Sequence, residues 1–192
     1  LDRLPELLGA ASFDRMVSNL PYRAGSRILA LIAGAAQPPA RMVVTVQEEV
    51  GRRLAAAAGT KDYGLLTLLV APVYTCRMLR RVAPTCFLPV PRVSSALVCC
   101  TRRAQSLVPD ADRAAYLRLI KLAFGRRRKQ IGSLFRAAGA ALARDETAWH
   151  HALRQAGVPL DARPETIDPP AWAALARSLR AERGTEGNAR HG

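Results

Sequence analysis

The clearest candidate for chemistry is the segment Asn19-Leu20-Pro21-Tyr22, which follows a short apolar run. The lone pair of an exocyclic amine such as N6 of adenine is delocalised into the ring. An enzyme that methylates this amine must therefore accept hydrogen bonds from its hydrogens and hold the nitrogen closer to tetrahedral. The Asn19 side chain offers one acceptor. The Leu20 carbonyl offers a second, because Pro21 favours an extended conformation for the residue before it and keeps that carbonyl out of a helix.

Tyr22 adds a ring face to these two acceptors. A base pulled out of its stack is normally held between aromatic or apolar side chains, so Tyr22 is a candidate for stacking on a target adenine. The four residues together predict adenine N6 methylation. The alternative, an ordinary turn between a strand and a helix, stays open on these residues alone, because Asn-x-Pro-aromatic is a short pattern.

The composition limits the classes of protein to which the chain can belong. The 192 residues suffice for one or two small domains, and 49% of them are hydrophobic. The sequence has no run of eighteen apolar residues and no secretory signal, which predicts a soluble cytoplasmic protein without a membrane span.

The charge points to a polyanionic partner. The formal net charge is +14, and such an excess suits nucleic acid, because phosphate neutralisation releases counterions. The alternative is that the gene belongs to a genome rich in G and C, which raises the arginine content of a protein whether or not it binds nucleic acid. The 26 Arg against 3 Lys are compatible with that explanation too.

No metal is expected. The cysteines stand at positions 76, 86, 99 and 100, without paired two-residue spacing and without a nearby histidine, so we interpret them as free thiols. His150 and His151 are adjacent and would lie on different sides of a helix.

The periodicity predicts an α/β part followed by helices. The expected strands are 13–17, 41–46, 74–82 and 93–101, and the expected helices are 26–36, 47–57 and 63–70, the last being helical or simply buried. The alternation of strand and helix suggests a parallel sheet, and the last two strands are expected to pair. The loop 87–93 between them cannot be a central strand, because its alternate prolines remove ladder donors.

After residue 105 only helical patterns remain. Asp110 or Asp112 is expected to cap a helix that ends at Gly125, and two more helices are expected at 146–155 and 170–180. We expect domains at 1–105 and 106–182 and a disordered tail at 183–192.

Four consecutive cations precede an apolar stripe in the helical part. Arg126, Arg127, Arg128 and Lys129 would form the first turn of a helix, where positive charge opposes the macrodipole. Phosphate binding would explain this local cost, and a solvated charge cluster is the alternative.

These pieces together resemble the small-subunit (16S) ribosomal RNA adenine N6,N6-dimethyltransferases. The resemblance runs nearly end to end and rests on six ordered motifs: Asn19-Leu20-Pro21-Tyr22, Val46-Gln47-Glu48-Glu49-Val50, Gly59-Thr60-Lys61-Asp62-Tyr63-Gly64, Phe87-x-Pro89-x-Pro91-x-Val93-x-Ser95-Ala96, Ala123-Phe124 with Arg127-Arg128-Lys129, and Arg163-Pro164-Glu165-Thr166.

The resemblance implies the remaining roles. Asn19 would lie between S-adenosylmethionine, the methyl donor, and the target amine, with Leu20 as carbonyl acceptor, and Tyr22 and Phe87 as the aromatics on either side of the adenine. The substrate would be two adjacent adenines near the 3′ end of small-subunit rRNA in a pre-ribosomal 30S particle. The helical part would dock the enzyme, which is expected to be a monomer, through the cations 126–129.

One departure from the family is large. No Gly-x-Gly turn follows a strand, and no acidic residue for a ribose comes after it, so the donor-binding strands of a Rossmann-like sheet are missing. We therefore expect the chain to be the C-terminal part of a Rossmann-like methyltransferase sheet followed by a small all-helical domain. A non-catalytic RNA-binding ribosome-assembly factor is the alternative function. Large-subunit rRNA and DNA adenine methyltransferases fit the motifs less well.

Overall fold

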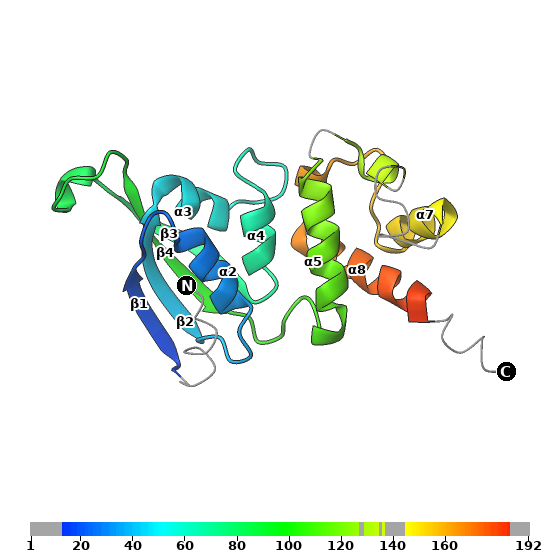
Figure 1. Ribbon diagram of the computed structural model, residues 1–192, viewed down its shortest axis with the longest axis horizontal. Coiled ribbons are helices and arrows are strands. Elements are labelled where there is room, and N and C mark those ends of the chain that lie inside the picture. Colours follow the sequence, from blue (N-terminus) through cyan, green and yellow to red (C-terminus); the bar gives the residue numbers. More distant parts are fainter. Residues whose placement is uncertain (1–12, 127–128, 135, 137–144, 185–192) are drawn as a thin grey trace. The chain divides into compact units, whose positions relative to one another are not determined.

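The computed structural model describes residues 13–126, 129–134, 136 and 145–184, and the chain divides into two compact units (Figure 1). Of the described residues, the sheet unit contains 13–56 and 62–106. The helical unit contains 57–61 and the residues from 107 onward.

The sheet unit is built on four strands, β1 (Arg15–Asn19), β2 (Arg41–Gln47), β3 (Tyr74–Val82) and β4 (Ser95–Arg102), in the order β1-β2-β4-β3. The pair β1 and β2 is parallel, as the sequence predicts. The other two pairs, for which the strand-helix alternation predicts no direction, are antiparallel. For β3 and β4 this follows because they form a hairpin, whose strands run in opposite directions. The predicted pairing of β3 with β4 is confirmed.

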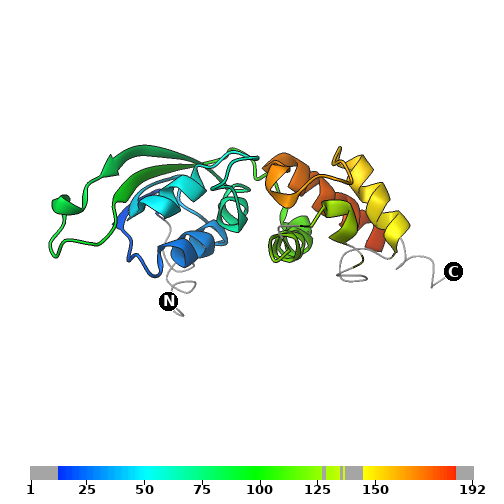
Figure 2. The same ribbon diagram turned by 90° about the horizontal axis from the view of Figure 1, so that it is seen from above.

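Three helices, α2 (Gly25–Ala33), α3 (Glu48–Leu54) and α4 (Leu65–Val70), lie on one face of the sheet (Figure 2). The strand side chains that face them alternate along the chain and are buried, because successive residues of a strand point to opposite faces. They are Met42, Val44 and Val46 of β2 and Ala96, Val98 and Cys100 of β4. Both α2 and α3 end three residues before their predicted ends, with Gly34 and Ala55 at their C-caps.

The helical unit contains α5 (Asp110–Phe124), α7 (Glu146–Gln155) and α8 (Pro169–Gly184), with short 3₁₀ turns η2 (Ile131–Ser133) and η4 (Pro164–Thr166). Its described core contains two fully buried tryptophans, Trp149 and Trp172. The Trp149 indole Nε1 donates to the carbonyl oxygens of Ile131 and Gly132 at 3.3 and 3.2 Å. These two hydrogen bonds hold the turn η2 against α7.

Asp112 does not cap α5, contrary to the sequence prediction, and Asp110 does not either. Pro109 occupies the N-cap without a side-chain hydrogen bond. The Asp112 carboxylate is buried and pairs with two arginines of α8, Arg177 at 3.5 Å and Arg180 at closer range. A buried carboxylate needs such partners, so the ion pairs take the place of the cap.

Arg126 and Lys129, the described residues of the cationic run, do not begin a helix. Gln130 is extended, with ψ 145°, and the 3₁₀ turn η2 starts after it at Ile131. The macrodipole cost expected for these two cations therefore does not apply. Helix α8 continues through Gly184, two residues into the predicted tail, and 185–192 lie outside the described residues.

All four cysteines are free thiols. Cys76 and Cys100 face each other across β3 and β4, with 2.9 Å between their sulfurs. This hydrogen bond and burial raise the pKa of the Cys100 thiol. Within the described ranges, no group of three or more metal-binding side chains is found and no helix is long and apolar enough to cross a bilayer.

A glycine of α3 allows the helix to approach β4. A Cβ at Gly51 would lie 2.6 Å from the Ala96 Cβ and 3.3 Å from the Val98 Cγ2.

We predict that Gly51→Ala destabilises the sheet unit by about 1–3 kcal/mol, because neither neighbour can move without shifting the backbone. Urea unfolding measures this. Gly25→Ala is the matched control, since its Cβ would meet atoms at 3.6 and 3.8 Å, and equal losses in both variants would contradict the prediction.

Candidate active site and basic pocket

The predicted acceptor segment lies at the carboxyl end of β1, an edge strand of the described sheet. Asn19 pairs in register with Thr45 of β2, and the Leu20 amide donates to the Thr45 carbonyl oxygen at 3.0 Å. The Leu20 side chain is buried in the core under the helices. The strand pairing and this buried side chain therefore hold the backbone of the segment in place.

The two predicted acceptors remain available in this arrangement. The Pro21 carbonyl accepts from the amides of Ala24 and Gly25 at 3.0 and 2.8 Å and so starts α2. In the described part of the chain, no hydrogen bond engages the Leu20 carbonyl, and the exposed Asn19 side chain has no partner. Two oxygen acceptors thus stand one peptide apart at the end of a strand, where they can receive the two hydrogens of an amine.

Tyr22 is fixed by a bond to a distant residue. Its phenol oxygen lies 2.5 Å from the Ser95 hydroxyl, and either group can be the donor. Ser95 is fully buried and is the first residue of β4. The Tyr22 ring is half-buried, so the hydroxyl pair limits how the ring can turn.

Phe87 lies in the β3–β4 hairpin, which extends beyond the sheet (Figure 1). Its amide donates to the Pro84 carbonyl at 3.1 Å, just after a 3₁₀ turn, η1 (Pro84–Cys86). Among the described residues, no hydrogen bond or ring contact joins Phe87 to Tyr22 or Asn19. The stacking role of Phe87 stays a prediction.

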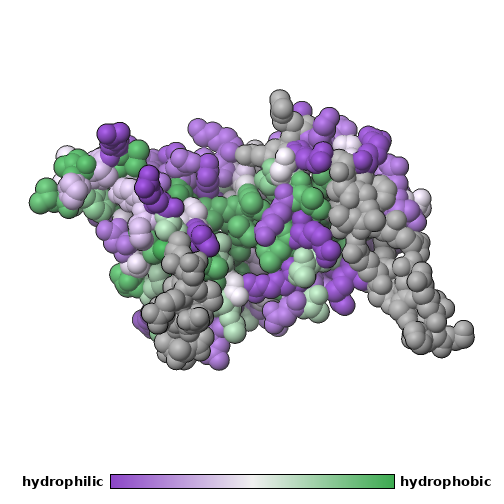
Figure 3. All heavy atoms as spheres, viewed as in Figure 1, coloured by the Kyte–Doolittle hydropathy of each residue, from purple (hydrophilic) through white to green (hydrophobic). Residues whose placement is uncertain are grey.

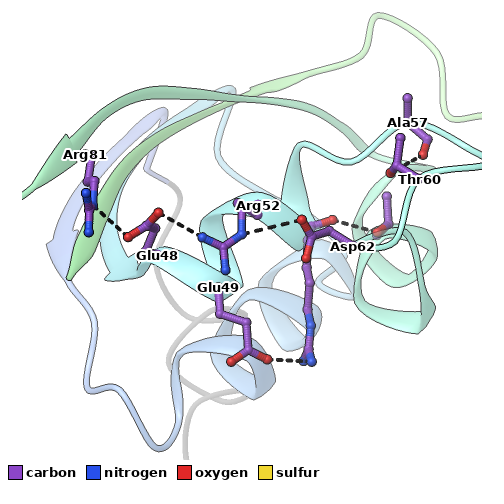
Figure 4. Close-up of polar contacts among 9 residues, drawn as sticks. Glu48, Glu49, Arg52, Ala57, Thr60, Asp62 and Arg81 are labelled. Atoms are coloured by element: carbon purple, nitrogen blue, oxygen red, sulfur yellow. Dashed lines mark hydrogen bonds and ion pairs between the residues drawn. The ribbon is translucent and has the colours of Figure 1, made fainter. Parts of the chain in front are cut away.

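An ion-pair network braces the base of this hairpin (Figure 4). The Glu48 carboxylate binds Arg52 of its own helix and Arg81 of β3, both at 2.8 Å, and Arg52 lies 3.4 Å from Asp62. Arg81 also donates to the Ser94 hydroxyl at 2.9 Å. Exposed pairs are individually weak, but the shared carboxylate joins α3 to β3, the strand that leads into the hairpin. Sequence reasoning missed this network. The i, i+4 spacing of Glu48 and Arg52 is its only local signal.

Two of the four predicted RNA-binding cations line a pocket of about 220 Å³. The lining residues, called the basic pocket below, are Arg126, Lys129, Ser133, Leu134 and Arg136. Arg127 and Arg128 lie outside the described residues. Sequence reasoning missed Arg136, because it stands inside the stripe expected to be apolar. Three cations, a hydroxyl and an aliphatic side chain thus line one pocket.

Among the described residues, Asn19 and Leu20 offer acceptors for an amine, but no Gly-x-Gly turn that could hold a nucleoside donor follows any described strand. The two carboxylates after β2 are already paired, Glu48 as above and Glu49 with Arg53 at 2.5 Å. The parts that would hold a nucleoside are therefore not among these residues.

The Tyr22–Ser95 bond can be measured by a double-mutant cycle. Tyr22→Phe and Ser95→Ala should each lower the free energy of unfolding by about 1 kcal/mol, and the double variant should lose no more than the larger single loss, because one bond is removed in all three. Urea unfolding gives these values. Additive losses would show that the two hydroxyls do not interact.

The comparisons with known proteins agree on one family. A sequence model of the family described as ribosomal RNA adenine dimethylase matches residues 13–156. A ribosomal RNA small subunit methyltransferase A of Myxococcus xanthus is 37% identical over 164 residues, 85% of this chain and 57% of the relative. The protein of the same name from Syntrophotalea carbinolica is 33% identical over 165 residues, 86% of this chain and 61% of the relative. The chain thus spans about three fifths of the length of these relatives.

Two solved structures share the fold. A dimethyladenosine transferase from Plasmodium falciparum superposes with a TM-score of 0.74 at 19% identity, covering 90% of this chain and 69% of that one. The 23S rRNA methyltransferase ErmE superposes with a TM-score of 0.61 at 24% identity and the same coverage. The four-stranded mixed sheet with its helices is therefore part of a Rossmann-like methyltransferase fold.

Proposed function

Because the chain belongs to the ribosomal RNA adenine dimethylase family, we propose that it methylates N6 of two adjacent adenines near the 3′ end of small-subunit rRNA. The observation that carries the proposal is the pair of unengaged acceptors at the end of β1. The Leu20 carbonyl and the Asn19 side chain suit an exocyclic amine with two hydrogens to donate.

The chain's own residues act by positioning. Asn19 and Leu20 accept the N6 hydrogens, which frees the nitrogen lone pair, and the Tyr22 ring supports the flipped base. S-adenosylmethionine supplies an electrophilic methyl group when it is bound. No nucleophilic side chain is needed, because the amine itself attacks.

The helical unit binds the RNA backbone in this proposal. Arg126, Lys129 and Arg136 of the basic pocket supply positive charge for a phosphate, and Arg127 and Arg128 add to it. The partner is the pre-ribosomal small subunit in the cytoplasm, bound by one copy of the protein.

A non-catalytic role in ribosome assembly is the second candidate. The observation that favours it is the basic pocket, whose cations suit an RNA backbone without taking part in any chemistry. Methyl transfer to immature small subunits by the intact protein from its own cells distinguishes the two candidates. RNA binding without transfer would support the assembly role.

Asn19→Ala should lower the rate of methyl transfer by about 10²–10³-fold, because one acceptor for the developing charge is lost. RNA affinity should stay within about twofold. Single-turnover transfer of labelled methyl groups measures the rate. Val17→Ala, in the same strand and exposed, is the control and should react like wild type. An unchanged rate in Asn19→Ala would exclude the role assigned to this side chain.

Charge reversal in the basic pocket should weaken RNA binding in a salt-dependent way. Lys129→Glu and Arg136→Glu should each reduce the slope of log K against log salt by about 0.7–1, the value for one phosphate contact. Filter binding over a salt series gives the slope. Arg154→Glu is the control, an exposed cation of α7 outside the pocket. The same slope in all variants would argue against phosphate contact there.

A further inference from the structure

The β3–β4 hairpin ends in an exposed aliphatic surface. Leu88 is 97% exposed, Val90 61% and Val93 45%, and these three side chains are called the hairpin tip below. Apolar surface gathers at the end of this hairpin in the space-filling view (Figure 3). Single exposed aliphatic residues are common on proteins, but three within six residues on one projecting loop need an explanation.

The backbone of the tip is stiff. Pro89 and Pro91 fix their own φ angles and restrict the residues before them, and Pro84 begins the turn that leads into the loop. A loop that is already ordered loses less conformational entropy when it binds. The tip is therefore suited to inserting its side chains into a partner as a preformed unit.

The charge around the tip favours a polyanion. Residues 63–109 contain six arginines and no Asp or Glu, so the whole hairpin lacks a carboxylate of its own. Arg92 lies within the tip loop and is exposed, while Arg80 and Arg81 lie at the base of the hairpin, where Arg81 pairs with Glu48. An aliphatic surface beside an exposed cation suits stacked bases with a phosphate next to them.

The chain also limits how far the tip lies from the predicted adenine site. Val90 precedes Ser95 by five residues, and the Ser95 hydroxyl contacts Tyr22. Five extended residues span at most about 18 Å. Since stacked nucleotides are about 3.4 Å apart, the tip lies within about five nucleotides of a base held at Tyr22.

We propose that the hairpin tip is a wedge, which inserts Leu88 and Val90 between stacked RNA bases beside the flipped adenine. The inference rests on the proposed function. Flipping a nucleotide leaves a gap in the stack and costs unstacking energy, and apolar side chains inserted between bases are known to hold such openings. Leu88 and Val90 fill the gap, while Arg92 contacts a neighbouring phosphate.

The test uses an RNA stem-loop with two adjacent adenines and a fluorescent 2-aminopurine next to them, which brightens when it is unstacked. The full chain should raise the fluorescence several-fold. The variant Leu88→Ser/Val90→Ser should lose at least two thirds of this rise while RNA affinity falls less than about threefold. Leu88→Met/Val90→Ile should restore the rise, because it restores apolar volume. Leu160→Ser, an exposed aliphatic residue of the helical unit, is the control and should behave like wild type.

The outcomes separate the wedge from the function on which it rests. An equal rise in wild type and in the double serine variant overturns the wedge and leaves the RNA-binding function standing. A wild-type chain that does not bind the RNA overturns both. If sedimentation shows that wild type self-associates through the tip and the serine variant does not, the surface serves a second copy and the wedge is wrong.

Discussion

The antiparallel pairing of β2 with β4 positions nearly every residue of the candidate site. The register runs from Arg41 opposite Thr101 to Gln47 opposite Ser95, while β1 lies on the other side of β2. Ser95 is thereby brought to the end of the sheet where β1 delivers Tyr22. A slip of one residue would turn Ser95 to the opposite face and expose the buried side chains of β4, since the side-chain period is two. The core and the site therefore depend on the same register.

The position of β4 between β2 and β3 also shapes the hairpin. Its base is held by Glu48, which binds Arg81 and joins the strand to α3, and the Glu48 amide donates to the Ser94 carbonyl at 2.9 Å. Among the described residues, no ion pair braces its far end, which carries exposed aliphatic side chains and Arg92. The hairpin thus has a base that is fixed beside Tyr22 and a far end that is suited to contact with a partner.

The helical unit builds its pocket from a turn instead of a helix start. The turn η2 is held by the Trp149 indole, and a Cβ at Gly132 would lie 2.7 Å from the Leu160 carbonyl oxygen, so the backbone passes there at close range. These contacts place Lys129 and Arg136 at one pocket. Buried packing, and not helix geometry, decides which cations meet at this pocket.

The sequence by itself determined the local chemistry and most of the elements. The acceptors and the aromatic ring can be recognised in the residues 19–22 themselves. Strands are recognised by alternation and helices by helical spacing, because both signals depend only on residues that are near in sequence. Only the tertiary structure decided that Tyr22 meets Ser95, 73 residues away, that Asp112 pairs with α8 instead of capping α5, and that Arg136 joins the basic pocket. Such contacts depend on register and on the packing of distant elements, and no local pattern encodes them.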